Sequence, residues 1–360
     1  MSAPVAAPEL VFSAWSAVSP YGMGAVAFSD GVLSGRSALG EADGAAGPFP
    51  RAGLIPDFSA AGYLGRKGTR AMDRLTGIAV ATVGLLVDEC GPDLVAEPER
   101  IGLVLGTGSG SAQSIMDFTT ESLTGELPYH VDPARFPNTV MNKAAGQSAI
   151  WHGLKGPNTT ITGDWLTGLL ALSYAARLLR GGRCDRVLVG AVEECTVQRG
   201  WLEWHAGADA RPAPAIGEGG TSFLLESPAA ASAVGRQPLA ALRATRFRAA
   251  DGDTAGALAI CLRSALVAAD IEPQTVRVVA PLLDDGAQAD AERSALTDVF
   301  GAPGPRLIDC RAQIGDTTAA AAGFQLAAVL SVLGQEPGAG VVTAVDRDGM
   351  VGCAIVETLR

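Results

Sequence analysis

The side chains best suited to covalent or metal chemistry in this 360-residue chain are six cysteines and three histidines. The cysteines lie far apart and form no CxxC pair, so the sequence indicates neither a zinc site nor a redox dithiol. None of His130, His152 and His205 has a second histidine at HxxxH spacing. We expect no metal, and a reduced, cytoplasmic protein. The cysteines are Cys90, Cys184, Cys195, Cys261, Cys310 and Cys353.

A glycine-rich turn, GTGSGS over residues 106–111, follows an apolar segment and precedes a helical one. Its third glycine is misplaced for a dinucleotide-binding fingerprint, and no phosphate-binding lysine follows it. The GxSxG elbow of serine hydrolases is also absent. We interpret the turn as the exit of a helix from a buried strand, and expect no cofactor.

Composition and charge exclude several classes of protein. Apolar residues make up 48% of the chain, which excludes disorder as the dominant state. The formal charge of −11 argues against nucleic acid or an anionic membrane surface as a partner. Neither a signal peptide nor an apolar run of about 18 residues is visible. The sequence predicts a soluble protein that does not enter a membrane.

Strand-like and helix-like periodicities alternate along nearly the whole chain, which predicts an α/β fold with largely buried sheets. The strands are expected at 10–17, 101–105, 158–162, 186–192, 221–225, 239–247, 276–280, 306–308, 340–344 and 353–359. The helices, rich in alanine and leucine, are expected at 70–90, 141–151, 166–179, 254–269, 289–300 and 317–333.

Two segments rich in glycine, proline and alanine, 205–220 and 227–238, lie near the middle of the chain. The order of elements before and after them is similar, which indicates an ancient duplication without repetition of residues. We predict two pseudo-repeated halves, 1–226 and 227–360, within one integrated unit.

Four segments in order resemble the β-ketoacyl synthase branch of the thiolase superfamily. The resemblance covers essentially the whole chain, and implies a five-layered αβαβα fold that works as a dimer. The segments are SAVSPYGMG with GRSALG (16–24 and 35–40), RAMDR (70–74) before the glycine turn, GPNTTITGDWLTGLLALSYAARLLRGGRCDRVLVGAVEE (156–194) and RAQIGDTTAAAAGFQLAAVL (311–330).

A condensing enzyme of this family needs a thiol at the N-terminus of a buried helix and two imidazoles. The resemblance places Trp165 where the cysteine is expected, Pro281 at the first histidine and Asp316 at the second. Neither an indole nor a proline ring can attack a thioester or transfer a proton. The resemblance therefore implies that no catalytic residue remains in this chain.

Ordinary structural roles also fit these residues. Trp165 can be a core aromatic, and Asp316 can cap the helix expected from Thr317. Another thiol, Cys195, follows two glutamates that are expected to raise its pKa. The late loop DRDGMVGC (346–353) resembles the family's glycine–phenylalanine gate with methionine at the aromatic position, and we expect no swinging gate there.

A member that keeps the fold and lacks the chemistry resembles the chain length factor of type II polyketide synthases, here of the highly reducing, polyene-forming kind. The resemblance implies a heterodimer with an active ketosynthase, whose acyl tunnel this chain would line and limit. Acyl carrier protein would be reached through the complex, because an acidic subunit is a poor dock for an acidic carrier.

The resemblance also implies where the tunnel gate and the dimer interface lie. Phe118 is the expected main plug, with Ser114 and Ser111 one and two turns earlier on the same helix face. Ile115 and Met116 are rival linings, and Phe118 can equally be ordinary helix core. Interface residues are expected in the strand 159–162 and in the segment 135–147. They are Thr159, Thr160, Ile161, Thr162, Met141 and Phe136.

Two other functions stay open from the sequence. A thiolase-fold enzyme could use aspartates near the degenerate catalytic positions as acid or base, because clustered carboxylates shift one another's pKa. A stand-alone, acyl-binding homodimer is the third hypothesis. The aspartates in question are Asp164, Asp284, Asp285 and Asp316.

Overall fold

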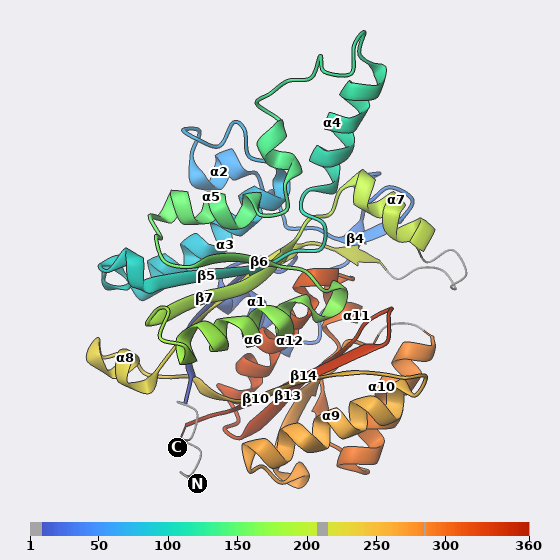
Figure 1. Ribbon diagram of the computed structural model, residues 1–360. Helices are drawn as coiled ribbons and strands as arrows, with labels where there is room; N and C mark the ends of the chain where they lie inside the picture. The colour runs from blue at the N-terminus through green and yellow to red at the C-terminus, as the bar shows by residue number, and fades with distance from the viewer. Residues whose placement is uncertain (1–8, 207–214, 284–285, 360) are drawn as a thin grey trace.

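Two layers of strands alternate with three layers of helices in the computed structural model, which describes residues 9–206, 215–283 and 286–359 (Figure 1). Helices α3 (Arg74–Cys90) and α5 (Lys143–His152) cover one layer of strands, and α6 (Thr167–Arg180) and α12 (Ala321–Leu333) lie in the middle (Figure 1). Helices α9 (Thr254–Ala269) and α10 (Ala287–Phe300) cover the other layer (Figure 1). The five-layered architecture predicted from the resemblance is therefore confirmed.

The first half of the chain supplies one layer of strands and the helices on both of its faces. The strands of this layer are β1 (Val11–Ser19), β2 (Gly22–Met23), β5 (Ile101–Gly106), β6 (Asn158–Ile161), β7 (Arg186–Glu193) and β9 (Gly219–Glu226). A separate small sheet is formed by β3 (Gly40–Glu41), β4 (Arg51–Gly53) and β8 (Ile216–Gly217). The helices of this half are α1 (Ala25–Leu33), α2 (Ala60–Leu64), α3 (Arg74–Cys90), α4 (Ala112–Thr124), α5 (Lys143–His152), α6 (Thr167–Arg180) and α7 (Val197–Ala206).

The second half supplies the other layer of strands. They are β10 (Ala240–Ala249), β11 (Val276–Ala280), β12 (Arg306–Leu307), β13 (Ala339–Val345) and β14 (Met350–Glu357). The helices are α8 (Pro228–Ala233), α9 (Thr254–Ala269), α10 (Ala287–Phe300), α11 (Cys310–Ile314) and α12 (Ala321–Leu333).

The two halves have the same sheet topology. Neighbouring strands follow the order β1-β9-β7-β5-β6 in the first half and β10-β14-β13-β11-β12 in the second. In each half the first two pairings are antiparallel and the last two are parallel. The internal duplication predicted from the order of elements is thus visible in the fold. The two layers also join into one sheet, because β1 pairs with β10 at Val11↔Ala241 and Phe12↔Ala240.

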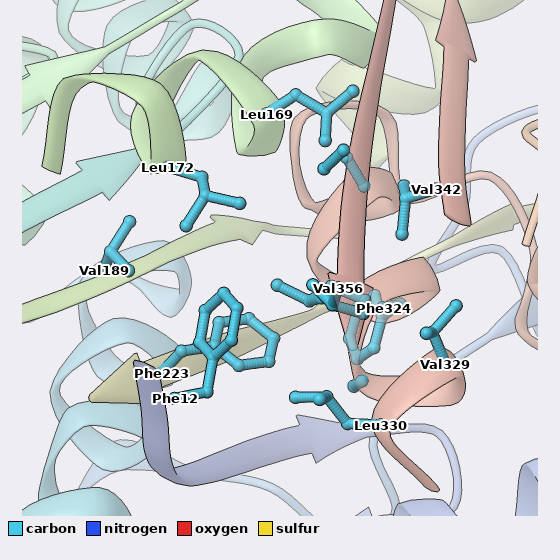
Figure 2. Close-up of a cluster of buried hydrophobic side chains, with 14 of the residues drawn as sticks. Phe12, Leu169, Leu172, Val189, Phe223, Phe324, Val329, Leu330, Val342 and Val356 are labelled. Atoms are coloured by element: carbon cyan, nitrogen blue, oxygen red, sulfur yellow. The ribbon is translucent and has the colours of Figure 1, made fainter. Parts of the chain in front are cut away.

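The central helices α6 and α12 pack between the two layers of strands, and small residues let them approach closely. A Cβ on Gly168 of α6 would lie 3.0 Å from the backbone nitrogen of Gly323 on α12. Around this contact, large apolar side chains from both halves form one core (Figure 2). They include Phe12, Leu169, Leu172, Phe223, Phe324 and Val342.

Several element boundaries differ from those predicted. The helix expected from residue 70 begins at Arg74, because Asp73 caps it by accepting a 2.7 Å hydrogen bond from the Thr76 N–H. The helix expected from Thr317 starts with a 3₁₀ turn, η6 (Thr318–Ala320), and becomes α-helical at Ala321. Within the described ranges no helix is long and apolar enough to cross a membrane.

Candidate functional site

The N-terminal ends of the two central helices meet at a buried tryptophan. A 3₁₀ turn, η4 (Asp164–Leu166), leads into α6 and contacts η6, which leads into α12. Trp165 is only 2% exposed, and its Nε1 donates a 3.1 Å hydrogen bond to Oδ1 of Asp316. The structure therefore brings together two residues that lie 151 positions apart in the sequence.

Two arginines flank the Trp165 ring. The Arg347 guanidinium carbon lies 4.5 Å from the ring centroid, and that of Arg311 lies 5.7 Å from it. Both distances are within the range of cation–π attraction. Arg311 also forms a 3.2 Å ion pair with Oδ2 of Asp316. Trp165 is thus held by one hydrogen bond and two guanidinium groups.

Arg347 comes from the loop in which the sequence pointed to Met350. Its Nη2 forms a 2.7 Å ion pair with Glu203 of α7, and its Nε lies 4.0 Å from Oδ2 of Asp164. The loop is therefore held by one residue of α7 and by one residue of the turn that leads into α6. Sequence reasoning missed Arg347 and Glu203, because nothing in the sequence near either residue indicates a contact across 144 positions.

Very little space remains beside Asp316, the hydrogen-bond partner of Trp165. Pro281 and Asp316 line the same cavity, which has a volume of about 10 Å³. This is room for one water molecule at most. The three positions that the resemblance assigned to a thiol and two imidazoles do gather in one place, because Trp165 is hydrogen-bonded to Asp316, and Asp316 and Pro281 line one small cavity.

The Asp316 carboxylate is stabilised in its charged form. Burial alone would raise its pKa, but the charges of Arg311 and Arg199 and the hydrogen bonds from Thr318 and Trp165 outweigh burial and lower the pKa. The Thr318 N–H donates to Oδ1 at 2.7 Å, as expected of a residue that caps a helix start. Asp316 therefore interacts with the Trp165 indole, the Thr318 N–H and the Arg311 guanidinium.

A second, separate pocket of about 270 Å³ lies beside Asp164, Glu193 and Glu203. Burial raises the pKa of Asp164 to about 6, against the opposing charge of Arg347. Arg199, also in the lining, is fully buried and donates to the carbonyl groups of Glu194, Gly217 and Asp316. The other two aspartates of the enzyme hypothesis, Asp284 and Asp285, lie outside the described residues.

Two buried glutamates hold the beginning of α4. The Gly108 N–H donates to Glu193 at 3.2 Å, and the Ser111 hydroxyl donates to Glu194 at the same distance. Burial raises the pKa of both glutamates to about 7. Burial is also the largest cause that raises the pKa of Cys195 to about 12, with smaller contributions from Glu218 and Glu194. Cys195 is thus an unreactive thiol at neutral pH.

The expected gate residues lie on α4, which projects from the body of the molecule (Figure 1). Ser111 is the N-cap of α4 and accepts from the Ser114 N–H. Ser114 lines an open hollow of about 740 Å³, bounded by α4, the segment 70–74 and the segment 132–138. The ring of Phe118 packs against that of Phe136. The rivals Ile115 and Met116 are half-buried on the same helix.

Four of the expected interface residues lie on or directly after β6, which is an open edge of the sheet in the part of the chain that the structure describes. Strand β6 is the last strand in the sheet order, with Thr159, Thr160 and Ile161 half-buried, and Thr162 follows it. Phe136 and Met141 are exposed in the segment that leads into α5. An unpaired edge with exposed apolar side chains nearby is suited to association with another chain.

Comparison with known proteins identifies the family. Residues 9–211 match the model "Beta-ketoacyl synthase, N-terminal domain". The chain belongs to the β-ketoacyl synthase family. It is 30% identical to "Putative polyketide beta-ketoacyl synthase 2" of Streptomyces halstedii over 93% of this chain and 87% of that protein. It is also 30% identical to "3-oxoacyl-[acyl-carrier-protein] synthase 2" of Vibrio harveyi over 43% of this chain, and it spans only 37% of that relative.

Solved structures agree with this assignment. The structure described as "The ishigamide ketosynthase/chain length factor" matches 98% of this chain and 100% of its own, with 38% identity and a TM-score of 0.89. A β-ketoacyl synthase from Burkholderia phymatum shares the fold at 19% identity and a TM-score of 0.83. The thiolase-like fold and its kinship with a ketosynthase/chain length factor are therefore established.

Proposed function

We propose that this chain is a non-catalytic ketosynthase-like subunit, a chain length factor, which pairs with an active ketosynthase and limits the acyl tunnel during polyketide elongation. The observation that carries the proposal is the filled site, where Trp165, Pro281 and Asp316 occupy the expected places of a thiol and two imidazoles. Arg347 and Arg311 close the remaining space around the tryptophan ring.

In this proposal the ketosynthase partner performs the decarboxylative condensation, and this chain supplies part of the tunnel wall. Volume exclusion is sufficient for that task, because a close-packed wall does not accept another two-carbon unit without strain. The gate would be Phe118, with the small side chains of Ser114 and Ser111 leaving depth before it. The similarity to the ishigamide ketosynthase/chain length factor supports the chain length factor role. A polyene-type product stays a prediction from the family resemblance.

The open edge at β6 is the proposed site of pairing with the ketosynthase. A strand added there would extend the sheet, and the segment 135–147 would face the same partner. Acyl carrier protein would then reach the complex through the ketosynthase. The six free cysteines support the predicted cytoplasmic location, where thiols stay reduced.

A second candidate function rests on Asp164. Its carboxyl, with a pKa of about 6, lines the 270 Å³ pocket and could act as an acid or base in other acyl chemistry. In that case the chain would turn over an acyl substrate without a ketosynthase. A stand-alone homodimer would instead bind acyl chains and show no turnover.

The test is to express this chain alone and together with a cysteine-bearing ketosynthase, and to assay extension of a carrier-bound acyl chain with malonyl-loaded carrier protein. Activity confined to the complex, and lost when the partner's nucleophilic cysteine is replaced by alanine, supports the proposal. Longer products from the complex carrying Phe118→Ala would support the gate. Turnover by this chain alone, abolished in Asp164→Asn, would overturn the proposal in favour of the second candidate.

A further inference from the structure

The expected gate residue Phe118 does not stand alone, because its ring packs against that of Phe136. The ring centroids are 6.1 Å apart and the planes are inclined by 58°. This separation is typical of an interacting aromatic pair. Phe118 belongs to α4, and Phe136 begins the 3₁₀ turn η3 (Phe136–Thr139), so two separate segments supply one apolar wall.

Two contacts hold η3 in place. Arg135 forms a 2.6 Å ion pair with Glu121 of α4, and the side-chain amide of Asn138 donates a 2.9 Å hydrogen bond to the carbonyl of Ala71. The backbone at Phe136 is thus tied to α4 on one side and to the segment before α3 on the other. Its ring nevertheless remains 57% exposed. Phe136 is therefore a positioned side chain that its own chain does not enclose.

The 740 Å³ hollow is lined by the two segments that carry the rings, and not by the rings themselves. Asp117 and Arg135, the sequence neighbours of the two phenylalanines, both line that hollow. Ser114, one turn before Phe118, lines it too. Ser114 and Phe118 are thus one turn apart on α4, and the ring of Phe136 contacts that of Phe118.

We propose that Phe136 is a second gate residue, which together with Phe118 sets the length of the acyl chain in the complex. This inference rests on the proposed function. When one ring is removed the other remains anchored, and rotation about its side-chain bonds can bring it partly into the gap. The summed bulk of both rings, rather than that of Phe118 alone, then decides where chain growth stops.

The experiment compares product lengths, by mass spectrometry, from complexes of the ketosynthase with the Phe118→Ala, Phe136→Ala and double variants, supplied with malonyl-loaded carrier protein. We expect Phe136→Ala to lengthen the main product by at least one two-carbon unit, and the double variant to exceed either single one. Phe136→Trp adds bulk at the same place and should shorten the product. Leu123→Ala, at an 80% exposed site on the same helix, is the matched control and should leave the product unchanged.

The inference is overturned if Phe118→Ala lengthens the product while Phe136→Ala and Phe136→Trp both leave it unchanged. The Trp variant keeps this test decisive even where the alanine variant does not fold. If no substitution at either position changes the product of an active complex, the gate on α4 itself is wrong. The two failures are therefore distinguishable.

Discussion

The site around Trp165 and the hollow beside α4 differ in the open volume that each contains. At the first, Leu282 and Ala321 of the second half pack against Trp165, and the cavity beside Asp316 and Pro281 has a volume of only about 10 Å³. The second is open, with about 740 Å³, and all of its lining comes from the first half of the chain. Under the proposed function, the site around Trp165 needs no open space, whereas the wall of a second subunit completes the hollow.

At the positions that the resemblance assigns to the catalytic groups, the side chains make stabilising contacts with one another. The indole, two guanidiniums and a carboxylate form one connected cluster. Substitutions in the cluster should therefore reduce stability, whereas substitutions in the hollow should change the product and leave stability nearly intact. Four measurements, given in decreasing order of expected change in stability, test this contrast.

Trp165→Ala should have the largest effect. It removes a fully buried aromatic side chain and leaves Asp316 without its indole partner, and should lower the free energy of unfolding by about 3–5 kcal/mol. Denaturant unfolding monitored by circular dichroism measures the change. Trp201→Ala removes the same side chain from a 48% exposed site and should cost about 1 kcal/mol or less. Equal losses of stability in the two variants would contradict the structural role given to Trp165.

Asp316→Asn should come next, with a loss of about 2–3 kcal/mol at neutral pH, because it removes the charge that Arg311 and the hydrogen-bond donors satisfy. The pKa of Asp316 is lowered in the folded state, so its contribution is present above its unfolded pKa and is lost as the pH falls below about 4. The variant should therefore lose less stability than the wild type on acidification. Asp185→Asn, which breaks the exposed pair with Arg100, is the control and should cost less than about 1 kcal/mol.

Glu193→Gln should change stability in the opposite direction. Burial raises the folded pKa to about 7 from an ordinary 4.5, so the wild type loses stability as the pH rises through this window. The variant cannot ionise and should be more stable than the wild type at pH 8, by about 1–3 kcal/mol, with a smaller difference at pH 5. Thermal unfolding at the two pH values measures this, and a pH-independent difference would contradict the assignment.

Ser114→Phe should have the smallest effect on stability, about 0.5 kcal/mol or less, because the new ring points into an open hollow. The complex with the ketosynthase should nevertheless make a product shorter by at least one two-carbon unit. Mass spectrometry of the products and an unfolding curve of the isolated variant test the two halves of this prediction. A large loss of stability without a change in product would place Ser114 in the core and not in the tunnel.

The layers and the duplication could be predicted from the sequence, because buried strands and alanine-rich helices leave clear periodic signals. Helix α9 begins and ends where its pattern does, at Thr254 and Ala269. The meeting of Trp165, Pro281 and Asp316 followed from resemblance and not from periodicity. Helix boundaries were harder to predict where a single side chain sets them. Asp73, for example, caps α3 and so fixes its first residue.

The contact of Arg347 with the Trp165 ring could not be predicted. Arg347 and Glu203 are joined by tertiary packing alone, and an isolated arginine in a DRDG loop is typically solvated. Likewise, the pairing of Phe118 with Phe136 depends on how η3 folds back onto α4, which the Arg135–Glu121 ion pair helps to fix. Helical spacing can place a residue on a face, but it does not say what covers that face.

The joining of the two halves at β1 and β10 has a consequence for synthesis on the ribosome. Strand β1 is covered on one side by β9, but the first two residues of its other edge, Val11 and Phe12, pair with β10, which begins at Ala240. At translation rates of roughly 5–20 residues per second, that edge stays open for about 10–50 s after β1 emerges. An open edge of this kind is a template for aggregation. The nascent chain therefore has a defined interval in which a chaperone can protect it, and that interval closes only when the second half arrives.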